Sequence, residues 1–170
     1  MNKNEYFQMQ LARSNSGALR SEIEAILRKA ATDLDTIEWV DDLSLQYNGI
    51  DAILTLKNGT RAALEIKCDY TDYENIVFER EQTAGKTLGW SLKRQESKLL
   101  MYYFTARKQA YFFGTSDVLA WYKANAHYLR DEKGYVFKTA KTTGSVIQPI
   151  PAEVVCAGVK QYAVYPRVVK

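Results

Sequence analysis

Three side chains near the middle of the chain could do chemistry together: Asp51, Glu65 and Lys67. Two carboxylates offer the hard oxygen ligands that Mg²⁺ prefers, and such an ion can activate a water and stabilise charge that develops on a phosphodiester. A lysine ammonium beside them can position that water or hold the phosphate. The pattern is short and common, so its meaning depends on whether the fold brings the three side chains together.

The segment that carries these residues is predicted to be a β-hairpin. Its two strands, about 49–56 and 60–68, are joined at a turn around Gly59. A two-residue turn would mix apolar and polar side chains on both faces of the hairpin. A three-residue loop, with Gly59 in the left-handed conformation, pairs Leu56 with Thr60 and separates the two kinds of side chain. The apolar pattern therefore selects the three-residue loop.

The selected register also decides which side chains share a face. It predicts the pairs Leu54–Ala62, Ala52–Leu64 and Ile50–Ile66 on one face, and Thr55–Arg61, Ile53–Ala63 and Asp51–Glu65 on the other, with Lys67 one step further. Two carboxylates directly opposite each other repel, and a divalent cation would remove that conflict. The alternative interpretation is a solvent-facing pair of strands with ordinary surface charges.

The rest of the sequence predicts helices and strands that alternate around this hairpin. A helix over 16–33 precedes it, because five apolar residues recur there at helical spacing: Leu19, Ile23, Ile26, Leu27 and Ala30. Also expected are strands at 36–40, 75–81, 99–104 and 109–113, a short helix at 91–97, a helix from Thr115 or Ser116 to about 125, and strand and loop beyond 135. This order is typical of an α/β sandwich around a mixed central sheet.

Length and composition indicate one domain over residues 16–170, after an N-terminal arm over 1–15. Apolar residues make up 46% of the 170 residues, and no apolar run approaches the ~18 residues that span a membrane. Because the start also lacks a signal-peptide pattern, a cytoplasmic protein without membrane contact is expected. Cys68, Cys156 and the single histidine, His127, are too few for a disulfide framework, a zinc site or a histidine-rich metal cluster.

The net charge of +3 is unevenly spread along the chain. Residues 1–85 have a net charge of −6, and residues 86–170 have a net charge of +9. An acidic half beside a basic half is typical of a protein that binds a cation and a polyanion together. The candidate phosphate-binding residues of the basic half are Lys86, Lys93, Arg94 and Lys98. The sequence around Lys86 is similar to the end of a P-loop, but Arg80 replaces the required glycine, so no nucleotide cofactor is expected.

On the hairpin residues, the sequence resembles the PD-(D/E)XK nuclease superfamily. Asp51 matches the metal-binding aspartate of that family, and Glu65-Ile66-Lys67 matches its (D/E)XK element on the next strand. The resemblance implies a restriction-endonuclease-like αβββαβ core, with a mixed central sheet flanked by helices. It also implies a Mg²⁺ or Mn²⁺ ion held by Asp51, Glu65 and the carbonyl of Ile66.

The neighbouring segments extend the resemblance, over roughly residues 16–125, to small phage-type members of the superfamily. In many members the first core helix supplies a further metal-binding acid, and here Glu22 is slightly preferred over Glu24 for that place. Glu79 or Glu81 would join the site if their strand lies beside the hairpin. The resemblance also implies a glutamine or a second lysine after Lys67. The sequence does not assign that residue, because Gln82, Lys86 and Lys93 are all candidates.

The resemblance implies a metal-dependent deoxyribonuclease related to Holliday-junction resolvases and restriction enzymes. We expect endonucleolytic hydrolysis of DNA, with branched DNA as one candidate substrate, in a phage or mobile-element setting of DNA recombination. A homodimer would allow two strands to be cut. Two alternatives stay open: a catalytically inactive nucleic-acid-binding or anti-defence module on the same fold, and an RNA-processing nuclease, since no residue type here separates RNA from DNA.

Overall fold

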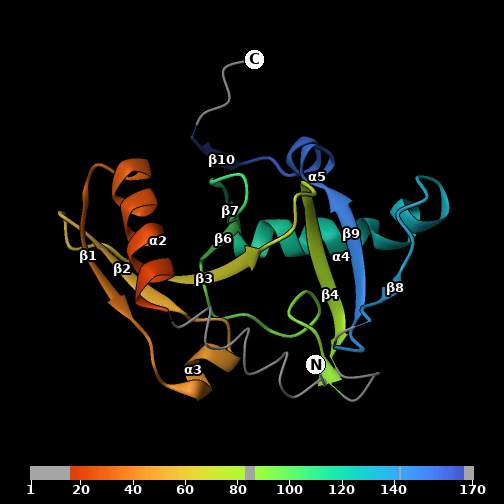
Figure 1. Ribbon diagram of the computed structural model, residues 1–170, viewed down its shortest axis with the longest axis horizontal. Coiled ribbons are helices and arrows are strands. Elements are labelled where there is room, and N and C mark those ends of the chain that lie inside the picture. Colours follow the sequence, from red (N-terminus) through yellow and green to blue (C-terminus); the bar gives the residue numbers. More distant parts are fainter. Residues whose placement is uncertain (1–15, 83–86, 142, 167–170) are drawn as a thin grey trace.

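The computed structural model describes residues 16–82, 87–141 and 143–166. The N-terminal arm predicted over residues 1–15 and the candidate phosphate-binding residue Lys86 lie outside this part of the chain. Across the described ranges, six strands form a mixed sheet, four more form an antiparallel sheet, and four helices surround them (Figure 1). The predicted α/β class with a mixed central sheet is confirmed.

The larger sheet is built around the predicted hairpin. Its strands are β1 (Leu34–Trp39), β2 (Ala52–Leu56), β3 (Arg61–Asp69), β6 (Leu99–Phe104), β7 (Gln109–Gly114) and β10 (Tyr162–Tyr165), in the spatial order β1-β2-β3-β6-β7-β10. β3 and β6 are parallel, and the other neighbouring pairs are antiparallel. A parallel pair needs a crossover connection, and here that connection carries further strands.

These further strands form the second sheet. The crossover holds β4 (Asn75–Gln82) and β5 (Thr87–Leu88), which combine with β8 (Lys138–Thr139) and β9 (Val146–Pro151) in the order β5-β4-β9-β8. All neighbouring pairs in this sheet are antiparallel. The strand predicted at 75–81 is therefore confirmed. The second helix of an αβββαβ core is not found in the described residues of the crossover.

The short helix predicted at 91–97 is wrong. Residues 90–92 form a turn, and the following residues are irregular. The N–H groups of Glu96 and Lys98 donate to the carbonyls of Asn48 and Ala63, each at 2.9 Å. These bonds tie the segment to the hairpin and use main-chain donors that a helix would pair internally.

The helix α2 (Gly17–Ala30) covers one face of the larger sheet. Ser16 caps it, because its hydroxyl accepts a hydrogen bond from the Leu19 N–H at 3.3 Å. Four residues of the predicted apolar stripe are buried against the sheet: Leu19, Ile23, Ile26 and Leu27. Ala30, the fifth, is exposed at the end of the helix.

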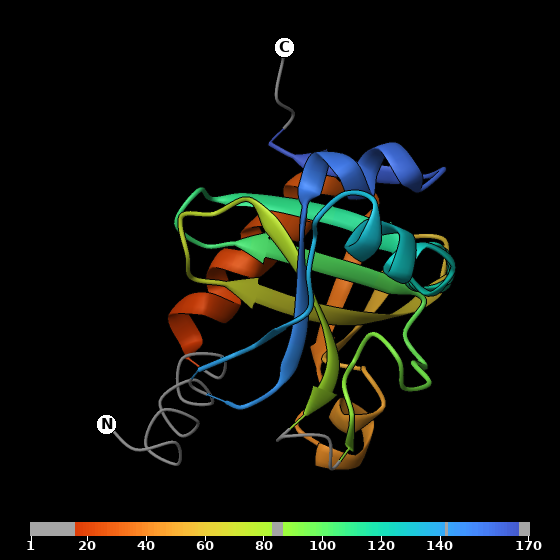
Figure 2. The same cartoon turned by 90° about the vertical axis from the view of Figure 1, so that its right-hand side faces the viewer.

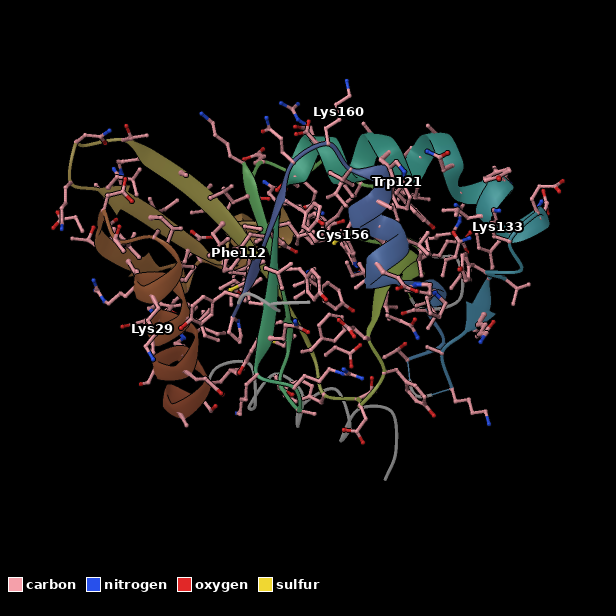
Figure 3. The ribbon with its side chains drawn as sticks, turned by 90° about the horizontal axis from the view of Figure 1, so that it is seen from above. Lys29, Phe112, Trp121, Lys133, Cys156 and Lys160 are labelled. Atoms are coloured by element: carbon pink, nitrogen blue, oxygen red, sulfur yellow. The ribbon has the colours of Figure 1, made fainter. Side chains whose placement is uncertain are left out.

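The opposite face is covered by the second sheet with α4 (Thr115–Asp131) and α5 (Ala152–Gly158), of which α5 was not predicted (Figure 2). In Figure 3, Lys29 of α2 lies on one side of the sheet, and Trp121 of α4 and Cys156 of α5 lie on the other. Aromatic stacking joins the layers: the Phe78 ring centroid of β4 lies 4.1 Å from that of Tyr122 and 5.4 Å from that of Trp90. This stacking holds β4 against α4 and against the turn after β5.

The remaining helix, α3 (Leu43–Tyr47), is in the connection from β1 to β2. Asp42 caps it by accepting hydrogen bonds from the N–H groups of Ser44 and Leu45, and none of its residues is buried. Since α3 buries no apolar stripe, it has no periodic signal in the sequence. In the described part of the chain, no helix combines the length and apolar character needed to cross a membrane.

The predicted register of the hairpin is confirmed from the turn to the Ala52–Leu64 pair, but the ladder does not include the predicted pairs Asp51–Glu65 and Ile50–Ile66. The paired residues are Thr55–Arg61, Leu54–Ala62, Ile53–Ala63 and Ala52–Leu64. The Leu56 N–H donates to the Thr60 carbonyl at 2.9 Å, and Gly59 has a φ of 81°. β2 begins at Ala52 rather than at residue 49, so Asp51 lies just before the regular ladder.

Gly59→Ala tests this turn without disturbing any packing, because a Cβ at Gly59 would meet nothing within 4 Å. Alanine is strained at positive φ, so we expect the unfolding free energy to fall by about 1–2 kcal/mol in urea denaturation. Gly17→Ala is the matched control, since a Cβ there also meets nothing within 4 Å but the residue is helical. Equal losses in the two variants would contradict the left-handed turn.

Candidate active site

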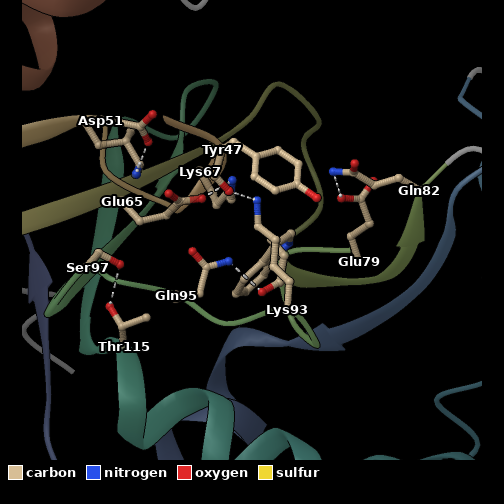
Figure 4. Close-up of polar contacts among 12 residues, drawn as sticks. Tyr47, Asp51, Glu65, Lys67, Glu79, Gln82, Lys93, Gln95, Ser97 and Thr115 are labelled. Carbon is tan, nitrogen blue, oxygen red and sulfur yellow. Dashed lines mark hydrogen bonds and ion pairs between the residues drawn. The ribbon is translucent and has the colours of Figure 1, made fainter. Parts of the chain in front are cut away.

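Asp51 is fixed beside the second strand of the hairpin by its own carboxylate. Its main-chain N–H donates to the Leu64 carbonyl at 2.8 Å, and its Oδ2 accepts a hydrogen bond from the Ile66 N–H at 2.7 Å. The carboxylate thus continues the contact between the strands beyond the Ala52–Leu64 pair. This places the Asp51 carboxylate near that of Glu65, although the two residues do not form the predicted pair in the ladder (Figure 4).

Glu65 and Lys67 point away from α2, because alternate residues of β3 face opposite sides and their neighbours in the strand pack against the α2 core. Glu65 is almost fully buried, with 2% of its surface exposed. Its Oε1 forms an ion pair with the Lys67 ammonium, which also lies 5.9 Å from the centroid of the Trp90 ring. The structure therefore brings together the three residues that the sequence singled out.

Gln95, which the sequence did not single out, completes this cluster (Figure 4). Its Nε2 donates to the Trp90 carbonyl at 2.8 Å, and this bond fixes the orientation of the amide. Among the described residues, Oε1 of Gln95 and Oε2 of Glu65 are both buried without a hydrogen-bond partner. Two acceptor oxygens without a donor therefore lie in one cluster.

Both oxygens converge on the space above Gly49. A Cβ at this position would stand 1.7 Å from Gln95 Oε1 and 2.8 Å from Glu65 Oε2. Gly49 also has a φ of 80°, which side chains other than glycine rarely adopt. Glycine is required here by both conformation and space, and it leaves room for the two acceptors to approach each other.

The charges of the cluster shift the pKa values of its members. Burial and the neighbouring Glu65 carboxylate raise the pKa of Asp51 to about 6. Burial lowers the pKa of Lys67, but the charges of Glu65 and Asp51 outweigh it and hold that pKa above its usual value. Lys67 therefore stays protonated at neutral pH and serves as a cation rather than as a proton acceptor.

The donor set of this cluster fits a divalent cation. Two carboxylates and an amide oxygen gather here, and two of these oxygens lack a hydrogen-bond donor. Mg²⁺ and Mn²⁺ take such oxygen ligands. Within residues 16–82, 87–141 and 143–166, no three His, Cys, Asp or Glu side chains gather closely enough to hold a metal. An ion here would therefore need Gln95 or main-chain oxygens in addition to Asp51 and Glu65.

Glu22, the acid preferred for the first helix, is not found at this cluster. It lies on α2, on the other face of the sheet, where it accepts a hydrogen bond from Tyr103 Oη at 2.6 Å and pairs with Lys108. The alternative, Glu24, accepts a hydrogen bond from Trp39 Nε1 at 2.7 Å. Both acids of α2 are engaged in structural contacts away from Asp51 and Glu65.

Of the candidate phosphate-binding residues, Lys93 reaches the cluster. Its Nζ donates to the Tyr47 carbonyl and lies 4.4 Å from the centroid of the Tyr47 ring (Figure 4). Burial and the charge of Lys67 lower the pKa of Lys93. Arg94 and Lys98 are exposed on the irregular segment. Because the helix predicted there is not formed, these three residues do not share a basic helix face.

The remaining predicted positions have other contacts. Ile66, whose carbonyl is the expected metal ligand, donates its N–H to Asp51. Glu79 accepts a hydrogen bond from Gln82 Nε2 at 3.2 Å, and its charge acts on Lys67, so β4 lies near the hairpin. After the motif lysine, two polar residues of the same segment reach the cluster: Lys93, one of the three candidates, and Gln95, which was not a candidate. Because a helix was predicted over residues 91–97, the sequence analysis did not identify Gln95 as a member of the cluster.

Comparisons with protein-family models, with curated protein sequences and with solved structures gave no significant match to this chain. The functional interpretation therefore depends on the hairpin and on the geometry of the cluster.

Asp51→Asn is expected to stabilise the metal-free protein near pH 8. The folded-state pKa of about 6 lies above the ordinary 3.8, so ionisation of Asp51 destabilises the fold as the pH rises through this interval, and the full penalty persists above it. Asparagine keeps an oxygen for the Ile66 N–H but carries no charge. We expect a gain of roughly 1–3 kcal/mol near pH 8 that disappears near pH 4, measured by urea denaturation in EDTA.

Asp35→Asn, at an exposed position of β1, is the control and should change stability little at either pH. A loss of stability in Asp51→Asn near pH 8 would show that the Asp51 carboxylate is not under repulsion.

Proposed function

We propose that the protein is a metal-dependent nuclease that hydrolyses phosphodiester bonds in DNA. The observation that carries this proposal is the meeting of Asp51, Glu65 and Lys67 with two buried acceptor oxygens that lack a donor among the described residues. An ordinary solvent-facing pair of strands does not bury a carboxylate and leave one of its oxygens unpaired, because such burial is unfavourable. A cation site gives the arrangement a physical reason.

The order of the elements also supports the proposal. α2 precedes the antiparallel strands β1, β2 and β3, and β6 then lies parallel to β3. This order is similar to a restriction-endonuclease-like core, with β4 and β5 in the crossover where the second core helix would be. The acids of the motif lie on its central hairpin, as they do in PD-(D/E)XK nucleases.

Each residue of the cluster has a distinct role in the proposed reaction. Asp51, Glu65 and Gln95 would hold the ion through side-chain oxygens, with the Ile66 carbonyl as the ligand that the motif implies. Bound Mg²⁺ or Mn²⁺ would supply a Lewis acid that activates water and stabilises negative charge on the phosphate. Lys67 donates from its ammonium to the phosphate or to the attacking water, and its ion pair with Glu65 keeps it in place.

Mn²⁺ should raise the unfolding temperature near pH 8, because a ligand that binds only the folded state stabilises it. Asp51→Asn and Gln95→Ala should each weaken Mn²⁺ binding at least about 10-fold, measured by titration calorimetry. Gln82→Ala is the control, since Gln82 is hydrogen bonded to Glu79 rather than to the cluster. Unchanged Mn²⁺ affinity in Gln95→Ala would remove Gln95 from the proposed ligands.

Asp51→Ala and Glu65→Ala should both abolish cleavage, because each leaves an incomplete metal site. Lys67→Met should lower kcat by roughly 10²–10³-fold and retain Mn²⁺ binding, since Lys67 contributes a charge and not a ligand. The assay compares labelled linear duplex, single-stranded and four-way-junction DNA and a matching RNA, with Mg²⁺, with Mn²⁺ and with EDTA.

Full activity in either acid variant would overturn the proposal. DNA binding without cleavage of any substrate would indicate a binding module on this fold. Cleavage of RNA alone would indicate an RNA-processing enzyme.

A further inference from the structure

The short helix α3 exposes apolar side chains beside the candidate active site. Leu43, Leu45 and Tyr47 keep 77%, 39% and 58% of their surface exposed, and no residue of α3 is buried. These side chains therefore contribute little hydrophobic stabilisation to the fold. Neighbouring exposed apolar residues of this kind are typical of a surface that binds a partner.

The chain itself fixes α3 next to the cluster. Asp51 follows Tyr47 by only four positions. In the intervening turn, the Ile50 N–H donates to the Leu45 carbonyl at 3.0 Å, and the Asn48 carbonyl accepts the N–H of Glu96 at 2.9 Å. These bonds hold the helix to the segment that carries Asp51 and to the segment that carries Gln95.

A cation is held against the Tyr47 ring. The Lys93 ammonium lies 4.4 Å from the ring centroid and donates to the Tyr47 carbonyl, and the charges of Lys67 and Glu65 both act on it. Figure 4 shows Lys93 reaching from its own segment toward Tyr47 and Lys67. An aromatic ring and an ammonium side by side are the two groups that hold a nucleotide of an unpaired strand: the base stacks on the ring, and the phosphate pairs with the cation.

We propose that Tyr47 is a stacking platform for an unpaired nucleobase and that Lys93 binds a phosphate of the same strand. This inference rests on the proposed function and narrows its substrate to DNA with a single-stranded segment at the site of cleavage. Bases inside a duplex stack on one another and present no free face to a tyrosine. A second copy of this chain would cover Leu43 equally well, but an apolar protein surface would not use the Lys93 cation. The cation favours a nucleic acid.

Binding of fluorescein-labelled DNA in EDTA tests the platform without cleavage. One oligonucleotide is measured as a single strand and as its duplex by fluorescence anisotropy. Tyr47→Ala should weaken binding of the single strand by about 5- to 150-fold, as expected for the loss of one stacked base, and should change duplex binding less than about 2-fold. Tyr47→Trp should keep the affinity for the single strand, because an indole also stacks.

Tyr128→Ala is the matched control. Tyr128 is 51% exposed and has the Lys133 ammonium 5.8 Å from its ring centroid, as Tyr47 has Lys93. Tyr128, however, lies on α4 rather than on α3. Its loss should leave both affinities unchanged. Lys93→Met tests the phosphate contact, and it should reduce the slope of log K against log salt by about 0.7 on the single strand.

Three results would overturn the inference: unchanged single-strand binding in Tyr47→Ala, an equal loss on single strand and duplex, or a loss of affinity in Tyr47→Trp. A change from dimer to monomer in Tyr47→Ala, seen by sedimentation with DNA binding unaltered, would also overturn it and assign α3 to self-association. The nuclease proposal fails separately. If no substrate is cleaved with Mn²⁺ but Tyr47→Ala selectively loses the single strand, the platform is confirmed on a protein that binds DNA without cutting it.

Discussion

The ion pair between the buried Glu65 and the partly exposed Lys67, with Asp51 beside it, is the interaction on which the candidate site depends. A carboxylate with 2% of its surface exposed needs a compensating charge, and Lys67 supplies it to one oxygen only. The other oxygen and the neighbouring Asp51 leave an excess of negative charge. Burial of Asp51, and then the charge of Glu65, raise the pKa of Asp51 to about 6. Strongly perturbed groups gathered in one place are typical of functional sites, where stability is sacrificed for chemistry.

The crossover that carries β4 and β5 contributes to the burial that makes this excess unfavourable. The Gly89 N–H donates to the Arg80 carbonyl at 2.8 Å, and a Cβ on Gly89 would stand 2.3 Å from the Glu79 carbonyl oxygen. This close approach anchors the turn after β5 to β4. Trp90 follows directly, and the Lys67 ammonium lies over its ring, so the turn after β5 supplies part of the low-dielectric surroundings of the ion pair.

The sequence predicted the central hairpin well because a single physical rule governs it. Register determines which face each side chain occupies, and the alternation around Gly59 permits one register with a clean apolar face. The apolar stripe of α2 was predicted in a similar way, from the helical spacing of its apolar residues. Neither rule applies to α3, which buries nothing, or to Gln95, whose position depends on tertiary hydrogen bonds of an irregular segment.

Glu22 shows the limit of helical periodicity as a guide to the site. Helical periodicity puts Glu22 and Glu24 on opposite flanks of the apolar stripe, but it does not say which part of the sheet each acid approaches. The position of Glu22 is determined by long-range partners, since it contacts Tyr103 of β6 and Lys108 of the turn between β6 and β7. Such contacts join residues too distant in sequence for a local pattern to reveal.

The hydrogen bonds that tie the crossover segment to the hairpin have a consequence for the order of folding. Asp51 and Glu65 are 14 positions apart and belong to one hairpin, whereas Gln95 follows Glu65 by 30 positions. The crossover between them includes β4, which pairs with β9 more than 60 positions further along the chain. Contacts between distant segments form more slowly than local ones. During synthesis, we therefore expect the two acids to meet before β9 has left the ribosome, while the amide oxygen joins them only when the second sheet closes.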